Sequence, residues 1–285
     1  MMTQTTNNEV LLQVNDLNVK LPIGRGQFVH AVKGIDFEIH NNERVGIVGE
    51  SGSGKSVTVR AISGLLPQSK LVQVTGSIRY KGQEFIGASV KNLAHLQAKE
   101  ISMIFQDPLS FLNPTMTVGK QITESLNQGN AKNRSRDEVY RFMTLAGLTK
   151  DLETVFDAYP FELSGGMRQR VLIAIALCRE PEIVIADEPT TALDATVQRR
   201  VLHSLDQSVK SLGKSMLLIT HDLGVVAAMC DRVYVMYSGK IVEHGTVDDI
   251  FYRPKHEYTK ELLKSVESFS NNDEELYVSK YALRA

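Results

Sequence analysis

Gly49-Glu50-Ser51-Gly52-Ser53-Gly54-Lys55-Ser56 fits the pattern GxxxxGK[ST] of a phosphate-binding loop. The loop follows a short apolar run, RVGIV, and precedes a stretch with helical patterning, residues 55–65. Its glycines let successive backbone N–H groups point at one phosphate cluster, and the helix N-terminus adds a partial positive charge. Lys55 can reach the β- and γ-phosphates, and the Ser56 hydroxyl can bind Mg²⁺. The stretch therefore predicts a nucleoside triphosphate site on a strand–loop–helix unit.

The residues on both sides of this unit predict an α/β fold. Two strands joined by a Gly-bearing turn precede the loop, in residues 11–39, and strands at 71–80 and 101–105 follow it. The character of the sequence changes from residue 108 onward, where Pro and Asn residues come first and helical patterns follow at 118–126 and 137–146. This segment indicates a helical insert. Beyond residue 164 helices and strands alternate, which favours a mostly parallel sheet. Those later elements are expected at 164–179, 195–212 and 256–266 (helices) and at 183–186, 215–219, 232–236 and 240–244 (strands).

Composition narrows the classes of protein that the chain can represent. The 285 residues suit one large domain or two small ones, and the net charge of -1 gives no basic excess, so no nucleic-acid partner is indicated. The two cysteines, Cys178 and Cys230, form no CxxC pair, and neither a zinc site nor a disulfide framework is expected. The N-terminus lacks a signal-peptide pattern, and no apolar stretch is long enough to span a bilayer. We expect a protein that is soluble or sits on a membrane through a partner.

An acidic pair follows a second apolar strand. In the stretch EIVIADEP, residues 182–189, Asp187 and Glu188 follow the apolar residues. Ligands of parallel sheets bind at the carboxyl ends of the strands. This pair should therefore meet the phosphate loop. Asp187 can hold Mg²⁺, and Glu188 can orient or deprotonate an attacking water.

A third motif, Leu163-Ser164-Gly165-Gly166-Met167-Arg168-Gln169-Arg170, resembles the signature of ATP-binding cassette (ABC) ATPases. Ser164 can cap a helix, and the two glycines leave its first amides open to an anion. The resemblance implies catalytic roles for Glu188, His221 (in LLITHD) and Gln106 (in IFQDP). It implies Mg²⁺ ligation by Ser56, Gln106 and Asp187, and ATP contacts from residues 49–56 together with Ser164, Gly165 and Gly166. Ala192-Leu193-Asp194 matches the family's dimer-contact loop.

The resemblance also implies an organisation for the chain. Residues 9–266 form the ATP-binding domain, with an N-terminal antiparallel β subdomain and a helical subdomain at about 108–160, and residues 267–285 form a polar tail. Two cassettes of the family dimerise head to tail, so that each ATP lies between one phosphate loop and the opposite LSGG. The helical insert is the expected contact with transmembrane partners. Leu21 occupies the position where the family usually has an adenine-stacking aromatic residue, and Phe28 is the alternative.

Three stretches resemble the peptide and nickel importer branch of the family: FQDPLSFLNP at 105–114, YPFEL at 159–163 and RPKHEYTKELL at 253–263. The four residues after LSGG, Met167-Arg168-Gln169-Arg170, resemble those of the D-type ATPase chain of dipeptide or oligopeptide importers. The branch implies a homologous F-type ATPase, two permeases, an extracytoplasmic binding protein and a peripheral location on the cytoplasmic face of the cell membrane. Dipeptides, oligopeptides, glutathione, nickel and metal chelates remain open as cargo. The tail has no cysteine, so no iron–sulfur cluster is expected.

Other functions use the same cassette. A soluble ABC ATPase acting on ribosomes or DNA is one alternative, and an exporter ATPase is another. Translation-factor cassettes usually come in pairs within one chain, and DNA-repair cassettes carry a long coiled coil. This chain has one cassette, and the segment from Gln106 to Ser164 is short and lacks a heptad pattern.

Overall fold

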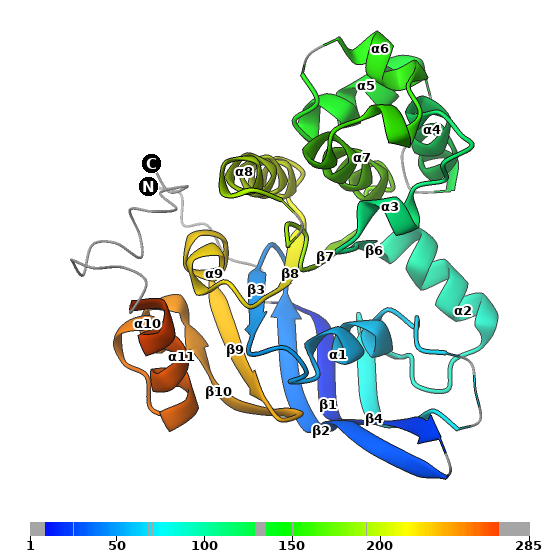
Figure 1. The fold of residues 1–285 in the computed structure, drawn as a ribbon. Helices are drawn as coiled ribbons and strands as arrows, with labels where there is room; N and C mark the ends of the chain where they lie inside the picture. Colours follow the sequence, from blue (N-terminus) through cyan, green and yellow to red (C-terminus); the bar gives the residue numbers. More distant parts are fainter. Residues whose placement is uncertain are drawn as a thin grey trace, which may run out of the picture.

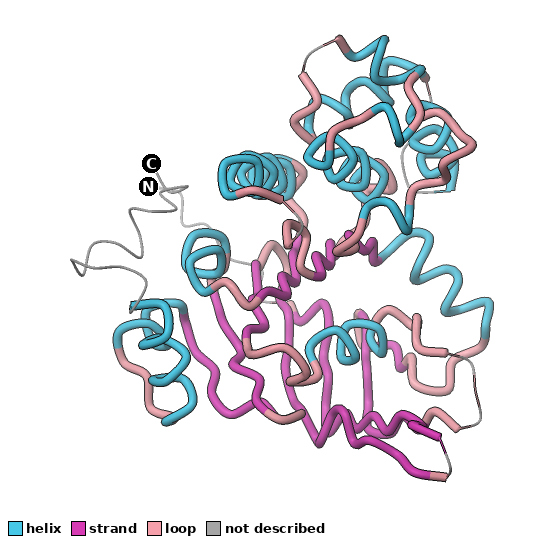
Figure 2. Tube along the Cα trace, in the orientation of Figure 1, coloured by secondary structure: helices cyan, strands magenta, loops and turns pink. Residues whose placement is uncertain are grey.

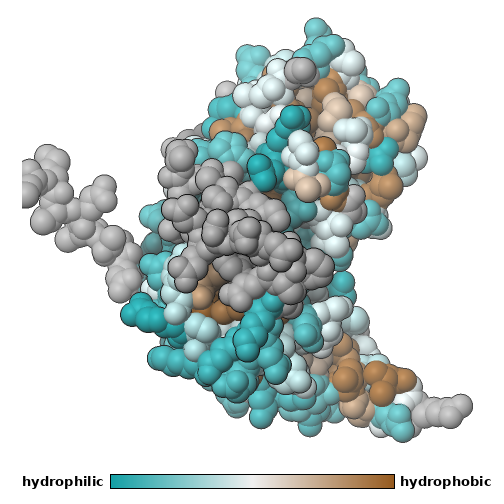
Figure 3. Space-filling view, turned by 60° about the vertical axis from the view of Figure 1, so that its left-hand side comes forward, coloured by the Kyte–Doolittle hydropathy of each residue, from teal (hydrophilic) through white to brown (hydrophobic). Residues whose placement is uncertain are grey.

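The computed structural model describes residues 9–24, 26–67, 69, 71–128, 135–149, 151–191 and 193–267. Strands gather in the lower lobe of the molecule and helices make up the upper lobe (Figures 1 and 2). The space-filling view shows an indentation between the two lobes (Figure 3). The expected polar tail lies outside the described residues from 268 onward.

The N-terminal sheet is antiparallel, as predicted. It contains β1 (Val10–Gly24), β2 (Gln27–His40), β4 (Gln73–Tyr80) and β5 (Gln83–Glu84), in the order β2-β1-β4-β5. Buried and more exposed residues alternate along much of β1 and β2, because one face of an antiparallel sheet covers the core and the other does not.

The second sheet forms the centre of the fold and is parallel except at one edge. Its order is β10-β9-β3-β8-β7-β6, and only β10 runs antiparallel to its neighbour. The strands are β3 (Arg44–Val48), β6 (Ile101–Ile104), β7 (Ile183–Asp187), β8 (Ser215–Thr220), β9 (Arg232–Tyr237) and β10 (Lys240–Thr246). Because β3, β8 and β7 are adjacent and parallel, the residues that follow them meet at one edge of the sheet.

The upper lobe contains the helices of the predicted insert, about residues 108–160, and continues beyond it to residue 177. Its core is built around Ile122, Leu126 and Phe142, whose side chains are fully buried. The elements are α3 (Pro108–Phe111), α4 (Val118–Gln128), α5 (Arg136–Leu145), α6 (Leu152–Asp157), η2 (Pro160–Glu162) and α7 (Gly165–Leu177). Buried residues occur on every side of α7, because this helix lies between the subdomain and the central sheet.

The remaining helices lie around the sheets. They are α1 (Lys55–Ile62), α2 (Val90–His95) with the short π-helix η1 (Leu96–Glu100), α8 (Ala195–Ser211), α9 (Leu223–Met229), α10 (Val247–Tyr252) and α11 (Glu257–Glu267). Helix α1 is shorter than predicted. Gly64 adopts φ +66° after it, and the N–H groups of Gly64 and Leu65 bond to the carbonyls of Ala61 and Arg60, which is a Schellman stop. No helix among the described residues has the length and apolar character of a membrane span.

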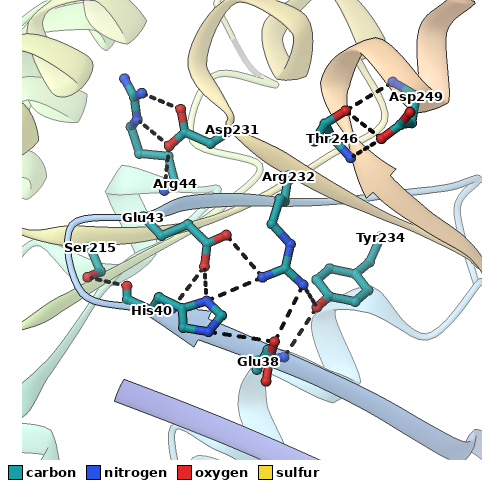
Figure 4. A network of polar contacts seen from close by, with 10 residues as sticks. All are labelled: Glu38, His40, Glu43, Arg44, Ser215, Asp231, Arg232, Tyr234, Thr246 and Asp249. Carbon is teal, nitrogen blue, oxygen red and sulfur yellow. Dashed lines mark hydrogen bonds and ion pairs between the residues drawn. The ribbon is translucent and has the colours of Figure 1, made fainter. Parts of the chain in front are cut away.

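A polar network ties the two sheets together at the edge where β3 begins (Figure 4). The Arg232 guanidinium, on β9, lies 3.1 Å from the Glu43 carboxylate and donates to the Tyr234 hydroxyl at 2.7 Å. That hydroxyl accepts a bond from the Glu38 N–H of β2. Arg44 bonds to Asp231 from its backbone N–H and its side chain. These polar contacts lie at the end of β3 opposite the phosphate loop, and they fix the register of β3 against β9.

Candidate nucleotide site

The phosphate loop lies between β3 and α1, as the sequence predicts. Gly49, Gly52 and Gly54 have φ values of +150°, +81° and +105°, which L side chains rarely adopt. A Cβ atom on Gly54 would lie 2.5 Å from the Ala31 carbonyl oxygen, and one on Gly49 would overlap the Met236 carbonyl. The loop is therefore pressed against β2 and β9 at Gly49 and Gly54, where space as well as backbone angle requires glycine, whereas at Gly52 only the backbone angle does.

Lys55 is buried at the start of α1. Its Nζ donates to the Gly49 carbonyl at 2.6 Å and to the Glu50 carbonyl at 2.8 Å. Burial lowers the pKa of Lys55, and the carboxylates of Glu188, Asp187 and Glu50 act against that shift. The loop thus holds a cation inside its curve, where phosphate oxygens are suitable partners.

Ser56 and Asp187 meet across the gap between α1 and β7. The Ser56 hydroxyl donates to Asp187 Oδ1 at 3.1 Å. Burial raises the pKa of Asp187, the Ser56 hydroxyl lowers it, and the Glu188 carboxylate raises it further. Oxygen atoms of this kind suit Mg²⁺, which usually takes one or two carboxylates and completes its shell with phosphate oxygens and water. Among the described residues no three His, Cys, Asp or Glu side chains gather into a metal site.

Two predicted residues, Gln106 and His221, converge on the carboxylate of a third, Glu188. Glu188 Oε2 accepts a bond from Gln106 Nε2 at 3.4 Å, and Glu188 Oε1 lies 3.5 Å from His221 Nδ1. The Glu188 N–H bonds to the Ile219 carbonyl, which holds the ends of β7 and β8 together. Thr191 also donates to Glu188 Oε2, at 2.9 Å. Thr191 is not among the residues predicted from the sequence, although its hydroxyl follows the acidic pair by only three positions.

A cavity of about 510 Å³ opens beside the loop. It is lined by Gln106 and Glu188 together with most of the phosphate loop, and extends along β2 and the β9–β10 turn. Leu21 lines it, and Phe28 is not among its lining residues. His30 and Lys33 also line it, and the sequence analysis did not single them out.

The signature residues lie elsewhere, at the start of α7. The Ser164 hydroxyl accepts the Met167 N–H at 3.4 Å, which confirms the predicted cap. Ser164 and Gly165 are exposed, and Gly166 is buried against Val197. None of the three lines the cavity beside the phosphate loop. Of the predicted dimer-contact loop, Leu193 and Asp194 are described, and Ala192 lies outside the described residues.

The residues present fit a bound nucleotide. The Ser53 hydroxyl is buried within the loop and has no hydrogen-bond partner among the described residues. A buried hydroxyl of this kind normally finds a partner, and a phosphate oxygen would supply one. The tight glycine turns, the buried cation and the hydroxyl–carboxylate pair complete a donor set suited to a triphosphate with Mg²⁺.

Comparisons with known proteins agree with this geometry. A family model described as ABC transporter matches residues 32–191. The chain is 46% identical over 267 residues to the oligopeptide transport ATP-binding protein OppD of Bacillus subtilis, covering 93% of this chain and 74% of that protein. It is also 46% identical over 270 residues to the dipeptide transport ATP-binding protein DppD of the same organism, covering 94% and 80%.

Solved structures share the fold. The dimeric post-hydrolysis state of the ATP-binding cassette MJ0796, bound to ADP and Pi, superimposes with a TM-score of 0.71 at 25% identity, over 83% of this chain and 98% of that chain. The cbiO1 protein of Clostridium perfringens, part of an ABC transporter complex, gives a TM-score of 0.72 at 28% identity, over 91% and 95%. This chain therefore belongs to the ABC transporter family, as one of its ATP-hydrolysing cassettes.

Proposed function

We propose that the chain is the ATP-binding and hydrolysing subunit of an importer for dipeptides or oligopeptides. The observation that carries the proposal is the convergence of Gln106 and His221 on Glu188 beside the phosphate loop. The names of the relatives, which are oligopeptide and dipeptide transport ATP-binding proteins, support a peptide cargo.

Each side chain then has a separate task. Backbone amides of residues 49–56 and the Lys55 ammonium would bind the phosphates. Ser56, Asp187 and Gln106 would hold Mg²⁺, which would neutralise phosphate charge. Glu188 takes a proton from, or orients, the attacking water. His221 and Thr191 would hold the Glu188 carboxylate in place, and His221 would contact the γ-phosphate of a bound nucleotide.

Glu188→Gln tests this assignment. The amide keeps the shape and the contacts with Gln106 and Thr191 but is a poor base, so MgATP binding should persist while phosphate release falls about 10²- to 10⁴-fold. Glu182→Gln is the matched control, because Glu182 immediately precedes β7, at the end opposite Glu188, and pairs with Lys214. Turnover by Glu188→Gln equal to that of the control would remove Glu188 from the reaction.

The exposed signature residues indicate that the site needs a second cassette. Ser164 and Gly165 present the N-terminus of α7, a helix of 13 residues, to solvent, away from the chain's own phosphate loop. Helix N-termini favour anions, so this end suits the phosphates held by another chain. A second homologous ATPase, either a further copy or an F-type chain, would complete two such sites.

A groove between the lobes is the proposed permease contact. Its volume is about 280 Å³, and its lining is mostly apolar, including Met103, Phe105 and Phe111. The rings of Phe105 and Phe111 stack with centroids 3.6 Å apart, and Phe111 is 50% exposed. Because Gln106 follows Phe105 directly, a partner in this groove would sense the state of the site.

The docking proposal has its own test. Phe111→Glu places a charge in the groove and should abolish copurification with the two permeases while MgATP binding stays unchanged. Tyr252→Glu, at an exposed position on α10, is the control. Retained copurification of Phe111→Glu would place the permease contact elsewhere. Association through permeases would set the chain on the cytoplasmic face of the membrane. An extracytoplasmic binding protein would deliver the peptide to the permeases on the opposite face.

A further inference from the structure

The phosphate loop is held from behind by a residue far away in the sequence. The Glu50 N–H donates to the Tyr258 hydroxyl at 2.9 Å, although 208 positions separate the two residues. Tyr258 lies in the first turn of α11 and is only 7% exposed. Burial raises the pKa of Tyr258 above its ordinary value, which keeps the hydroxyl protonated and neutral at physiological pH.

The peptide unit between Gly49 and Glu50 is fixed at both of its polar atoms. Its carbonyl oxygen accepts from Lys55 Nζ at 2.6 Å, and its N–H bonds to Tyr258. Rotation of this peptide would break both bonds at once. The Tyr258 hydroxyl therefore influences the same carbonyl that holds the Lys55 ammonium in place.

Tyr258 is itself firmly supported. Its ring packs on the Tyr237 ring at 4.2 Å between centroids, and its N–H bonds to His256 Nδ1. The Glu243 carboxylate, on β10, accepts the N–H groups of Lys255 and His256 at 2.7 and 3.0 Å. The start of α11 is thus attached to the central sheet, which gives the hydroxyl a fixed position relative to the loop.

We propose that Tyr258 is a positioning residue for the phosphate loop, acting through the Gly49–Glu50 peptide. The proposal rests on the nucleotide site proposed above. It assigns a task within the segment RPKHEYTKELL to its tyrosine, Tyr258. Without the hydroxyl only the bond from Lys55 to the Gly49 carbonyl restrains the peptide, and more of the loop's order must be gained when the nucleotide binds.

Tyr258→Phe removes only the hydroxyl and keeps the ring pair. The expected result is about a 2- to 10-fold weaker MgATP affinity and a matching rise in KM, with kcat nearly unchanged, as for the loss of one hydrogen bond that orders the site. Faster hydrogen exchange of the Glu50 amide should accompany it. Tyr237→Phe is the matched control, because among the described residues no hydrogen bond of the Tyr237 hydroxyl is found, and it should change none of these quantities.

Two results would overturn the proposal. Unchanged exchange at the Glu50 amide in Tyr258→Phe would show that the hydroxyl does not hold this peptide. Faster exchange with unchanged KM and affinity would show that the bond does not position the nucleotide. Neither result touches the proposed function, which the Glu188→Gln variant tests separately. Equal melting temperatures of the two Tyr→Phe variants would separate positioning from a general loss of stability.

Discussion

The variant Gly54→Ala tests whether the phosphate loop needs glycine because a side chain has no space there, and not only because of the positive backbone angle. A Cβ atom at this position lies 2.5 Å from the Ala31 carbonyl oxygen and 2.8 Å from the Met236 methyl group. Ordinary contacts of a Cβ atom begin at 3.4 Å, so the loop must move by about 0.9 Å relative to β2. Met236 can turn its flexible side chain away, but the backbone carbonyl of Ala31 is fixed within the sheet.

A shift of this size reaches the atoms that bind phosphate. Gly54 directly precedes Lys55, and a misplacement of about 1 Å can cost about 10² in rate. Gly52→Ala is the matched control, because Gly52 also has a positive φ but no atom lies within 4 Å of its added Cβ. It bears the backbone strain alone, about 1–2 kcal/mol.

The assay is phosphate release together with MgATP affinity for both variants. We expect Gly54→Ala to lose about 10² in kcat/KM and Gly52→Ala to lose about ten-fold or less. Equal losses in the two variants would show that backbone angle alone decides, and would refute the argument from contact with β2.

Three further outcomes follow from single features. Burial raises the pKa of Asp187 above its ordinary 3.8, so the protein loses stability as the pH rises through the folded pKa. The nucleotide-free variant Asp187→Asn should therefore melt at least as high as wild type at pH 7, with a smaller advantage at pH 4, and should not turn over MgATP. A lower melting temperature of the variant at pH 7 would contradict this. Ser164→Arg should keep the fold and MgATP binding but stop transport, because it fills the exposed start of α7, and normal transport would disprove a site shared between chains. Burial raises the pKa of Cys178 to about 12, so this thiol should react with a thiol reagent at pH 8 far more slowly in the native protein than in the unfolded chain. The reaction is followed by absorbance, and equal rates would contradict the burial of Cys178.

The strongly patterned elements were predictable from sequence. The apolar strand before Gly49 and the one before Asp187 placed both motifs at one sheet edge, and the parallel pairing of β3, β8 and β7 confirms it. The long helices of the insert were also found. Short helices were missed, including α2, α6 and α9, because six or seven residues carry too little periodicity and depend on caps such as Ser89 and Asp151.

Contacts between distant parts of the chain were beyond reach. Nothing local in the segment around Tyr258 reveals its bond to Glu50, since that bond depends on how α11 docks against the sheet. The same holds for His30 and Lys33, which line the cavity only because β2 runs beside the phosphate loop. Motif spacing predicts which groups do chemistry, but tertiary packing decides which groups hold them.

The central claim is that the loop ending in Lys55 binds the nucleotide. Calorimetric titration of the purified chain with MgATP tests it directly, with Lys55→Ala as the comparison. Loss of charge-assisted bonds to phosphate, worth about 1.5–3 kcal/mol each, predicts affinity at least ten-fold weaker in the variant. Equal affinity of the two proteins, with both still folded by circular dichroism, would contradict the account.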